Sequence, residues 1–532
     1  MKKENNEKFY IIGGGIASLA SAAYLIRDGK ILGENIIIFE ETSNLGGSLD
    51  GEKFSENAYI LRGYRMFENK VYSGMFDLMS FIPSLDNPEK TLKDEFLEFN
   101  EKNDFFNKCR LVEKSKRIDS NYLGLSWKDK YNLLKIITRS EKSLGFSQIK
   151  DNFTPEFFKT NFWYETCTVF AFQSWHSAAE FRRYCLRYIH TVPYMSTVKV
   201  LKSTPYAQSD SITLPIVKWL KERGVIIREN SRVYDFDFGP NKNVERIYYF
   251  DKLAKKEIIV NENDYVLATI GSMTENSSFG SMDEAPTKKI EKIGGAWELW
   301  KNIANKVYDF GNPSAFTDNI EDSEFQSFTI TFQDSTIPNL IENFTGRAAG
   351  RGEGLTFKDS NWLMSLIVPY QPHFINQPKN LTVCWGFGLL SREKGNFVKK
   401  RMLECSGKEI LIELFSHFGF DKKWEMEKLI EKSICIPCRL PYATSQFLPR
   451  KKGDRPKVIP KGSKNFAFLG QFCEIPKETT FTIEYSIKSA QKAVYSLLHL
   501  GRKTSPIYRG ERNIKVLFNA LKIIFKNKTY DV

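Results

Sequence analysis

Short apolar runs separated by glycines open the chain. Phe9–Ile12 is an uninterrupted apolar run, as expected of a strand buried on both faces, and Asn35–Glu40 contains a second such run. Between them, the glycines at 13–15 are followed by Leu19–Arg27, whose Ala and Leu content favours a helix that Gly29 ends. The pattern predicts a strand, a glycine loop, a helix and a second strand within about 30 residues.

The glycine loop matches the fingerprint of dinucleotide-binding proteins, with Gly13, Gly15 and Ser18 at the three glycine positions. Gly15 lets backbone N–H groups approach a diphosphate at the helix N-terminus. Glu40 ends the second strand, where a carboxylate can hold ribose hydroxyls, and the nearby Gly46-Gly47 pair is typical of FAD enzymes. We therefore predict an FAD site rather than a glycine loop without a nucleotide. The residues expected to form it are Gly13, Gly15, Ile16, Ala17, Ser18, Glu40, Gly46, Gly47, Ser48, Arg62, Gly63, Ser272, Gly470 and Thr482.

Distant segments complete this picture. Short β patterns recur over residues 225–260, residues 264–272 and 466–470 read as strands that end at glycines, and residues 482–498 have a helical period. The predicted fold class is α/β, with a discontinuous Rossmann-like FAD-binding domain of the two-domain flavoprotein type. We assign residues 8–75, 195–290 and 440–500 to that domain, residues 76–194 and 291–439 to an inserted α+β substrate domain, and residues 501–532 to a C-terminal helical tail.

The tail is basic and amphipathic. Residues 501–532 hold eight Lys and Arg against two acidic residues, a net of +6 in a chain whose net charge is +13. Residues 511–527 are predicted to form a helix that meets an anionic membrane surface. A helix docked on the protein body or on a second subunit fits the same pattern. The apolar stripe consists of Ile514, Leu517, Phe518, Leu521, Ile524 and Phe525.

Composition adds bounds. With 532 residues, the chain is too long for one core, and 14% aromatic residues fit either a long apolar pocket or a Phe-rich core. The single Cys-x-x-Cys motif, at 435–438, lacks a partner pair, so no metal site is expected. No apolar run reaches the roughly 20 residues of a membrane span, no signal-peptide pattern is present and no nucleic-acid module is seen. We expect a cytoplasmic protein, with binding at the inner face of the membrane as an alternative. The oligomeric state stays open, a homodimer included.

Several longer blocks of the chain match a known family. They are residues 13–20, 44–51, 62–65, 170–178, 180–184, 271–275, 359–365, 441–450 and 484–486. With these blocks the chain resembles the oleate hydratase family, also called myosin-cross-reactive antigens, over roughly residues 8–500. The resemblance implies FAD-dependent addition of water to a cis double bond of an unsaturated fatty acid, inside a long apolar tunnel. The flavin would shape and polarise the site without being consumed.

The resemblance also implies catalytic positions. Protonation falls to Tyr184. Because Arg182, Arg183 and Arg187 are close to it in the sequence, we expect them to stabilise its phenolate. The family's water-activating Glu corresponds to Met66, and a thioether cannot take a proton. Glu68, two positions later, is the weaker substitute.

The substrate block departs from the family pattern as well. Ala207 and Ser209 replace polar residues, while Gln208, His373 and Thr444 are kept as candidate substrate contacts. Three functions therefore stay open: fatty-acid hydration by a hydro-lyase, a flavin-dependent oxidoreductase or double-bond isomerase acting on a lipid, and lipid binding without turnover.

Overall fold

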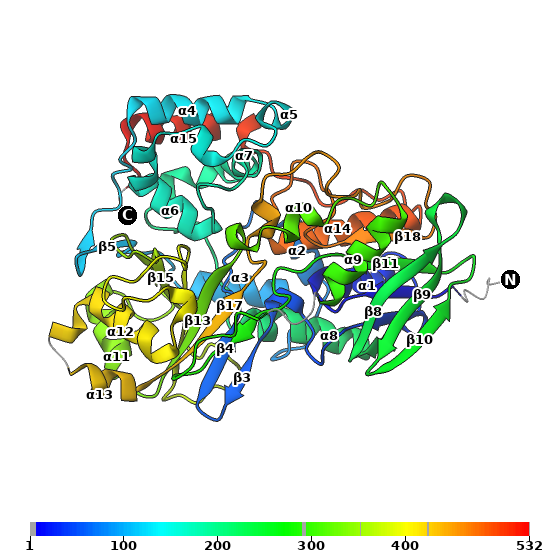
Figure 1. Ribbon diagram of the computed structural model, residues 1–532, viewed down its shortest axis with the longest axis horizontal. Helices are drawn as coiled ribbons and strands as arrows, with labels where there is room; N and C mark the ends of the chain where they lie inside the picture. The colour runs from blue at the N-terminus through cyan, green and yellow to red at the C-terminus, as the bar shows by residue number, and fades with distance from the viewer. Residues whose placement is uncertain (1–6, 290–293, 352, 423–424, 531–532) are drawn as a thin grey trace.

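A parallel sheet, a large and mostly antiparallel sheet, two smaller antiparallel sheets and a helical lobe form the part of the molecule that the structure describes (Figure 1). The computed structural model describes residues 7–289, 294–351, 353–422 and 425–530. The expected boundary between residues 290 and 291 lies outside the described residues. The helical lobe stands at the top of Figure 1, the parallel sheet is at the right and the large sheet is at the lower left.

The parallel sheet has five strands, and their order follows from three separate stretches of the chain. The three central strands are four or five residues long. They are almost wholly apolar, because helices or other layers cover both faces of the sheet. The order is β18 (Phe466–Leu469), β11 (Tyr265–Thr269), β1 (Phe9–Ile12), β2 (Ile36–Phe39) and β7 (Ile226–Arg228).

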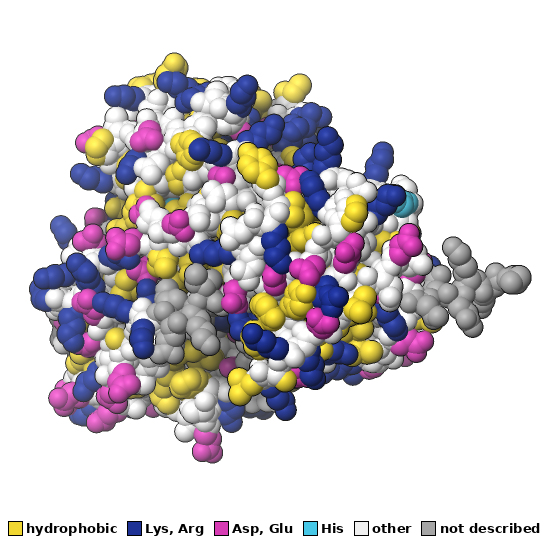
Figure 2. All heavy atoms as spheres, turned by 45° about the vertical axis from the view of Figure 1, so that its right-hand side comes forward, with side chains coloured by type: hydrophobic (Ala, Val, Ile, Leu, Met, Phe, Trp, Pro, Cys, Tyr) yellow, Lys and Arg dark blue, Asp and Glu magenta, His cyan; other side chains and the backbone are white. Residues whose placement is uncertain are grey.

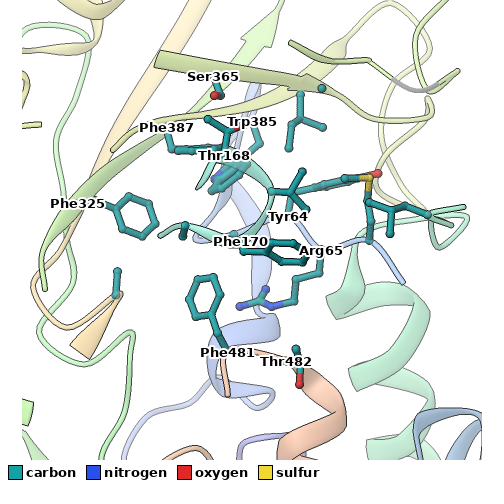
Figure 3. Close-up of a pocket in the computed structure, with 18 of the residues that line it drawn as sticks. Tyr64, Arg65, Thr168, Phe170, Phe325, Ser365, Trp385, Phe387, Phe481 and Thr482 are labelled. Carbon is teal, nitrogen blue, oxygen red and sulfur yellow. The ribbon is translucent and has the colours of Figure 1, made fainter. Parts of the chain in front are cut away.

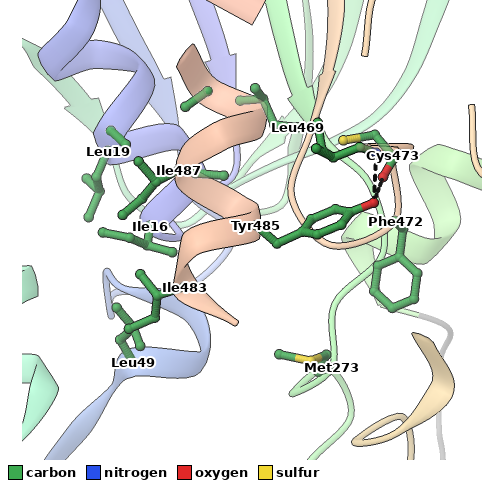
Figure 4. Close-up of a cluster of buried hydrophobic side chains, with 14 of the residues drawn as sticks. Ile16, Leu19, Leu49, Met273, Leu469, Phe472, Cys473, Ile483, Tyr485 and Ile487 are labelled. Atoms are coloured by element: carbon green, nitrogen blue, oxygen red, sulfur yellow. Dashed lines mark hydrogen bonds between the residues drawn. The ribbon is translucent and has the colours of Figure 1, made fainter. Parts of the chain in front are cut away.

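Two helices pack together against this sheet, α1 (Ile16–Arg27) and α14 (Ile483–Leu497). Apolar side chains of both helices meet strand β18 in one buried cluster (Figure 4). Within it, the Tyr485 hydroxyl donates to the Cys473 carbonyl at 2.7 Å and accepts from the Ile475 N–H at 2.9 Å. These bonds give the buried Tyr485 hydroxyl a donor and an acceptor, and they connect α14 to the loop after β18.

The other three sheets are formed mostly by antiparallel strand pairs. Beside the parallel sheet, β8 (Ser231–Phe238), β9 (Val244–Asp251) and β10 (Ala254–Ile259) form a three-stranded meander, and β3 (Gly51–Ser55) pairs with β4 (Ala58–Leu61). The large sheet has the order β12 (Ser278–Phe279), β17 (Ser433–Leu440), β13 (Phe325–Phe332), β16 (Thr382–Gly388), β15 (Met364–Val368), β14 (Glu353–Phe357), β5 (Leu111–Glu113) and β6 (Lys116–Ile118).

Helices cover these layers or form the lobe. The lobe contains α4 (Trp127–Thr138), α5 (Glu141–Leu144), α6 (Asn161–Phe170), α7 (Ala178–Arg187) and α15 (Ile514–Lys526). The other α-helices are α2 (Ser73–Met79), α3 (Leu92–Lys102), α8 (Leu214–Lys221), α9 (Gly295–Lys306), α10 (Ser314–Thr317), α11 (Thr336–Thr345), α12 (Gly407–Phe418) and α13 (Met426–Glu431). Among the described residues, no helix is both long and apolar enough to cross a bilayer.

Buried ion pairs hold α7 in place. The Glu180 carboxylate lies 3.0 Å from the Arg455 guanidinium. The Glu478 carboxylate lies 3.0 Å from the Arg187 guanidinium and 2.6 Å from the Lys488 ammonium group. These residues come from α7 and from the last quarter of the chain, so the pairs fasten the lobe to the parallel-sheet layer. Because each buried charge needs its partner, the network fixes α7 and the Tyr184 that it carries.

Candidate functional site

A cavity of about 450 Å³, which we call the glycine-loop cavity, lies at the carboxyl ends of β1, β2 and β11. Ligands of open α/β sheets bind at such strand ends. Eleven of the predicted cofactor residues line it: Gly13, Gly15, Ile16, Ala17, Glu40, Gly46, Gly47, Ser48, Arg62, Ser272 and Gly470.

The loop between β1 and α1 suits a diphosphate. The first helical turn begins after Gly15, which caps α1 without any side-chain hydrogen bond. Gly13 has φ +93°, a conformation that favours glycine. Gly14 was not among the predicted cofactor residues, yet a Cβ atom there would stand 2.6 Å from Leu45 and 2.8 Å from the Glu40 carboxylate. A bare backbone therefore lines the cavity here, and the N–H groups that lack intrahelical partners are those of the first turn of α1, after Gly15.

Three predicted cofactor residues, Ser18, Gly63 and Thr482, have other positions. Ser18 is buried against β11, with its hydroxyl 3.1 Å from that of Thr269, which is the packing role expected of a small residue. Thr482 caps α14 by accepting from the Tyr485 N–H at 3.2 Å. Thr482 and Gly63 line a neighbouring cavity instead.

Glu40 remains beside the cavity but is already engaged. Its carboxylate accepts the Gly14 N–H at 2.7 Å and the Thr42 N–H at 2.9 Å. Further along the wall, burial and then the nearby Glu41 carboxylate raise the pKa of Glu275 well above its ordinary value. Glu41 accepts the Gly295 N–H at 3.0 Å. The consecutive acidic residues Glu40 and Glu41 are the feature of the sequence that could have predicted the acidic end of the glycine-loop cavity.

Beyond the loop, the glycine-loop cavity meets a second cavity. Arg62, Met273 and Thr274 line both. Arg62 is fixed at the junction, because its guanidinium donates to Asp50 at 2.9 Å and to the Thr274 carbonyl at 3.1 Å. A group bound along the glycine loop would thus reach the second cavity.

The second cavity, called here the aromatic cavity, encloses about 140 Å³ between the large sheet and α6, α7 and α14 (Figure 3). Most of its surface is apolar, as an acyl chain requires. Its aromatic walls include Tyr64, Phe170, Tyr184, Tyr188, Phe325, Trp385, Phe387 and Phe481.

Arg65 is one of three arginines that line the aromatic cavity, with Arg62 and Arg110. Figure 3 shows its guanidinium between the rings of Phe170 and Phe481. Its Nη1 has no hydrogen-bond partner among the described residues, and burial lowers its pKa to about 10. A cation held in an apolar cavity favours a ligand with negative charge or a negative end. Arg65 lies in one of the blocks that carry the family resemblance, at residues 62–65, but no role was predicted for it.

Tyr184 lines the aromatic cavity beside Met66, as the family resemblance implies. Its hydroxyl donates to the Thr480 carbonyl. The expectation that sequence-adjacent arginines favour the phenolate is wrong: burial and then the Tyr72 hydroxyl raise the pKa of Tyr184 well above its ordinary value. Arg183 and Arg187 are instead held in ion pairs with Glu141, Glu474 and Glu478.

Glu68 is not brought to the cavity. Its buried carboxylate accepts the Lys70 N–H at 2.8 Å and the Val71 N–H at 2.9 Å, and it lies 3.1 Å from His190. These contacts hold the Glu68 side chain against the turn at residues 69–71. It does not line the aromatic cavity with Met66, so the structure gives it no position from which to replace the missing carboxylate.

The three candidate substrate contacts also lie off the walls. The Gln208 side-chain amide donates at 3.3 Å to the Arg65 carbonyl and so stabilises the loop that carries Arg65. His373 packs next to Tyr64 with ring centroids 5.9 Å apart, and burial lowers its pKa to about 3. Thr444 donates to the Ser323 carbonyl at 3.0 Å.

A third cavity, the helical chamber, lies in the lobe next to the aromatic cavity. It encloses about 120 Å³ between α4, α6, α7 and α15. The residues that line both cavities are Val169, Phe170, Tyr184, Tyr188, Val198 and Leu201. The two adjoining cavities therefore give an apolar interior between the C-terminal helix and the junction with the glycine loop.

The fold is that of two-domain flavoproteins. Two solved structures share the architecture: cyclohexylamine oxidase from Brevibacterium oxydans, with a TM-score of 0.51 and 11% identity over 93% of this chain and 100% of that one, and putrescine oxidase bound to putrescine, with a TM-score of 0.51 and 9% identity over 93% and 99%. At such identities the likeness concerns the fold alone.

Sequence comparison places the chain more narrowly. The MCRA family model matches residues 6–495, and the chain belongs to this family. It is 39% identical to the oleate hydratase of Streptococcus pyogenes serotype M49 (strain NZ131) over 523 residues, which are 96% of this chain and 87% of that protein. It is 31% identical to the linoleate hydratase of Lactiplantibacillus plantarum over 564 residues, covering 97% and 98%.

Proposed function

We propose that this protein adds water to a cis double bond of an unsaturated fatty acid with FAD as its cofactor. The observation that carries the proposal is the junction at Arg62, Met273 and Thr274, where an apolar cavity with Tyr184 on its wall opens onto the glycine-loop cavity. Relatives named oleate hydratase and linoleate hydratase support the substrate class.

The residues around the glycine-loop cavity fit the proposed cofactor. Gly15, Ile16 and Ala17 lie at the start of α1, where backbone N–H groups lack intrahelical partners and could hold the diphosphate, and Glu40 stands at the end of β2 for ribose hydroxyls. When bound, FAD polarises the site without being consumed, since hydration involves no net redox change. Arg62 belongs to both cavities and would contact cofactor and substrate regions together.

Hydration needs a proton at one carbon and an activated water at the other. Tyr184 is the proposed proton donor, because it lies on the wall shared by the two apolar cavities. Its raised pKa keeps the phenol protonated at neutral pH, although it also makes the phenol a weak acid. Met66 cannot accept a proton from water, so a general base must come from elsewhere.

Met66 is also the observation that favours the alternative, a flavin-dependent oxidoreductase or isomerase acting on a lipid. Incubation with oleate, linoleate and palmitoleate, with FAD and a reductant, separates the two by product mass. Water addition predicts a gain of about 18 mass units and a redox reaction predicts a change of about 2. Unchanged mass with a shifted double bond, or no reaction, would refute hydration.

The helical lobe supports a second part of the proposal, docking on an anionic membrane. Helix α15 buries Ala520, Ile523 and Ile524 against the body, while Ile514 and Phe518 stay 83% and 65% exposed. Trp127 of α4, 73% exposed, stands beside Phe525 with ring centroids 5.8 Å apart. The helix therefore docks on the body and still presents an apolar face.

Lysines surround this face. Lys128, Lys515, Lys522 and Lys526 come from the same two helices, and Figure 2 shows Lys and Arg side chains beside exposed hydrophobic ones on the lobe. Aromatic and basic side chains together favour the surface of an anionic bilayer, from which a fatty acid could enter the helical chamber.

Flotation with phosphatidylglycerol vesicles tests the docking surface. Phe518→Glu should reduce binding, while Leu253→Glu, on a 95% exposed residue of the β9–β10 turn, should not. Equal binding by the parent and by Phe518→Glu would contradict membrane docking through this face. A homodimer and a cytoplasmic location remain predictions, and measurement of the molar mass in solution tests the first.

A further inference from the structure

Glu165 is a buried carboxyl group without a hydrogen-bond partner. It lies on α6, its residue is 1% exposed, and neither carboxyl oxygen is hydrogen-bonded to any described residue. Burying a polar group without a partner costs free energy, so an apolar residue would serve packing better at this position. The other buried glutamates of the lobe and its anchors, Glu180 and Glu478, both have cationic partners.

The location of Glu165 connects it with the proposed reaction. It lines the helical chamber, and so does Tyr184, while Val169 and Phe170 on the same helix form the wall between this chamber and the aromatic cavity. The remaining lining is mostly apolar. An acyl chain that runs through both cavities would therefore pass the only carboxylate among the residues that line them.

Arg110 is the nearest influence of opposite charge. Its guanidinium donates to neutral acceptors, among them the Thr168 hydroxyl at 2.6 Å, the Gly354 carbonyl at 2.8 Å and the backbone carbonyl of Glu165 at 3.4 Å. The Glu165 side chain forms no ion pair with it. Arg110 therefore stabilises the carboxylate from a distance without occupying its oxygens.

Burial dominates over that attraction. It raises the pKa of Glu165 to about 8, with Arg110 lowering it and Asp119 raising it further. Lys130, the cation of the chamber, donates to the Phe525 carbonyl at 3.1 Å. The other titratable groups that face the chamber are Tyr184, Cys185, Tyr188 and Tyr194.

We propose that Glu165 is the proton acceptor for the attacking water, in place of the carboxylate that Met66 lacks. This inference rests on the proposed function. Glu165 would hold a water molecule in the chamber through its unpartnered oxygens and take one proton as the water attacks.

Atoms and charges balance in this scheme. The Tyr184 O–H bond breaks and a C–H bond forms at one alkene carbon, while the π bond supplies the electron pair. A C–O bond forms from water at the other carbon, and the water's second O–H bond breaks toward the Glu165 carboxylate. Return of that proton to the Tyr184 phenolate restores both groups, so no oxidant, reductant or further reactant is needed.

The test compares Glu165→Gln with the parent and with Glu156→Gln, a control at an exposed glutamate nearby. Glu165→Gln should lower kcat for hydration by about 10²–10⁴-fold, the contribution of a general base, while FAD binding stays unchanged. Its melting temperature should equal or exceed that of the parent, because an unpartnered acid is removed. Parental kcat in Glu165→Gln would overturn the inference.

Two further measurements exclude a merely structural role. The parent rate should rise with pH up to about 8, since only about a tenth of the carboxyl is ionised one unit below its pKa, and Glu165→Gln should lose this rise. The double variant with Met66→Glu and Glu165→Gln should hydrate the substrate at least tenfold faster than Glu165→Gln alone.

The outcomes separate this inference from the proposed function. A pH profile that is unchanged in Glu165→Gln, or a loss of rate accompanied by loss of bound FAD or a lower melting temperature, would refute the role of Glu165 alone. Failure of the parent to add water to any substrate of the panel would refute both.

Discussion

Replacement of Gly15 by leucine should abolish tight FAD binding without unfolding the protein. Gly15 precedes α1 with φ −75° and ψ 173°, an extended conformation that any residue adopts. A Cβ atom there would have only one neighbour beyond the adjacent residues, the Cα atom of Gly47 at 3.9 Å, an ordinary contact distance. The remaining leucine atoms would enter the gap beside the glycine-loop cavity, which Gly15 and Gly47 both line.

The expected loss follows from the contacts that leucine would block. Hydrogen bonds between backbone N–H groups and a charged phosphate contribute about 1.5–3 kcal/mol each. Loss of two of them costs about 3–6 kcal/mol, equivalent to about 10²–10⁴-fold in Kd. Gly15→Ala, which adds only the tolerated Cβ, should bind FAD with a much smaller loss.

Titration of apoprotein with FAD, followed by flavin fluorescence, measures the effect. The melting temperatures of the apo forms of parent, Gly15→Ala and Gly15→Leu should agree, because the Cβ has space. Gly14→Ala is the contrasting variant: its Cβ would meet Leu45 at 2.6 Å, so it should lower stability as well as affinity. A folded Gly15→Leu protein with parental Kd for FAD would refute the assignment of this cavity.

Three further predictions concern the reaction and the fold. Tyr184→Phe should remove water addition, seen as loss of the mass gain, while FAD stays bound; parental turnover would show that this phenol is not the proton donor. Met66→Glu should raise the hydration rate of the parent by less than the gain of at least tenfold expected in Glu165→Gln, because Glu165 already supplies a general base, and an equal or larger gain in the parent would argue against that role. Glu478→Ala should lower the free energy of unfolding by about 3–5 kcal/mol, since Arg187 and Lys488 lose their shared buried partner. Denaturant titration measures this loss, and a change under about 1 kcal/mol would mean that the network contributes little.

The local sequence was sufficient to predict the β1–α1–β2 unit and the C-terminal helix. Helix α15 spans Ile514–Lys526 within the predicted range 511–527, and β1, α1 and β2 follow the predicted order. Such features are readable because apolar periodicity and glycine conformation act over a few neighbouring residues. Even the family position of Tyr184 on a cavity wall came from a contiguous block.

Only the tertiary structure decided which polar side chains face the cavities. Glu68, Gln208 and His373 look like catalytic or binding residues in the sequence, yet each is engaged by backbone or packed off the walls. Glu165 and Arg65 carried no signal, and both line cavities with unpartnered polar atoms. The reason is physical: whether a polar group is free depends on donors and acceptors that folding brings from segments hundreds of residues apart, as Thr480 does for Tyr184, and those partners leave no mark on the local pattern.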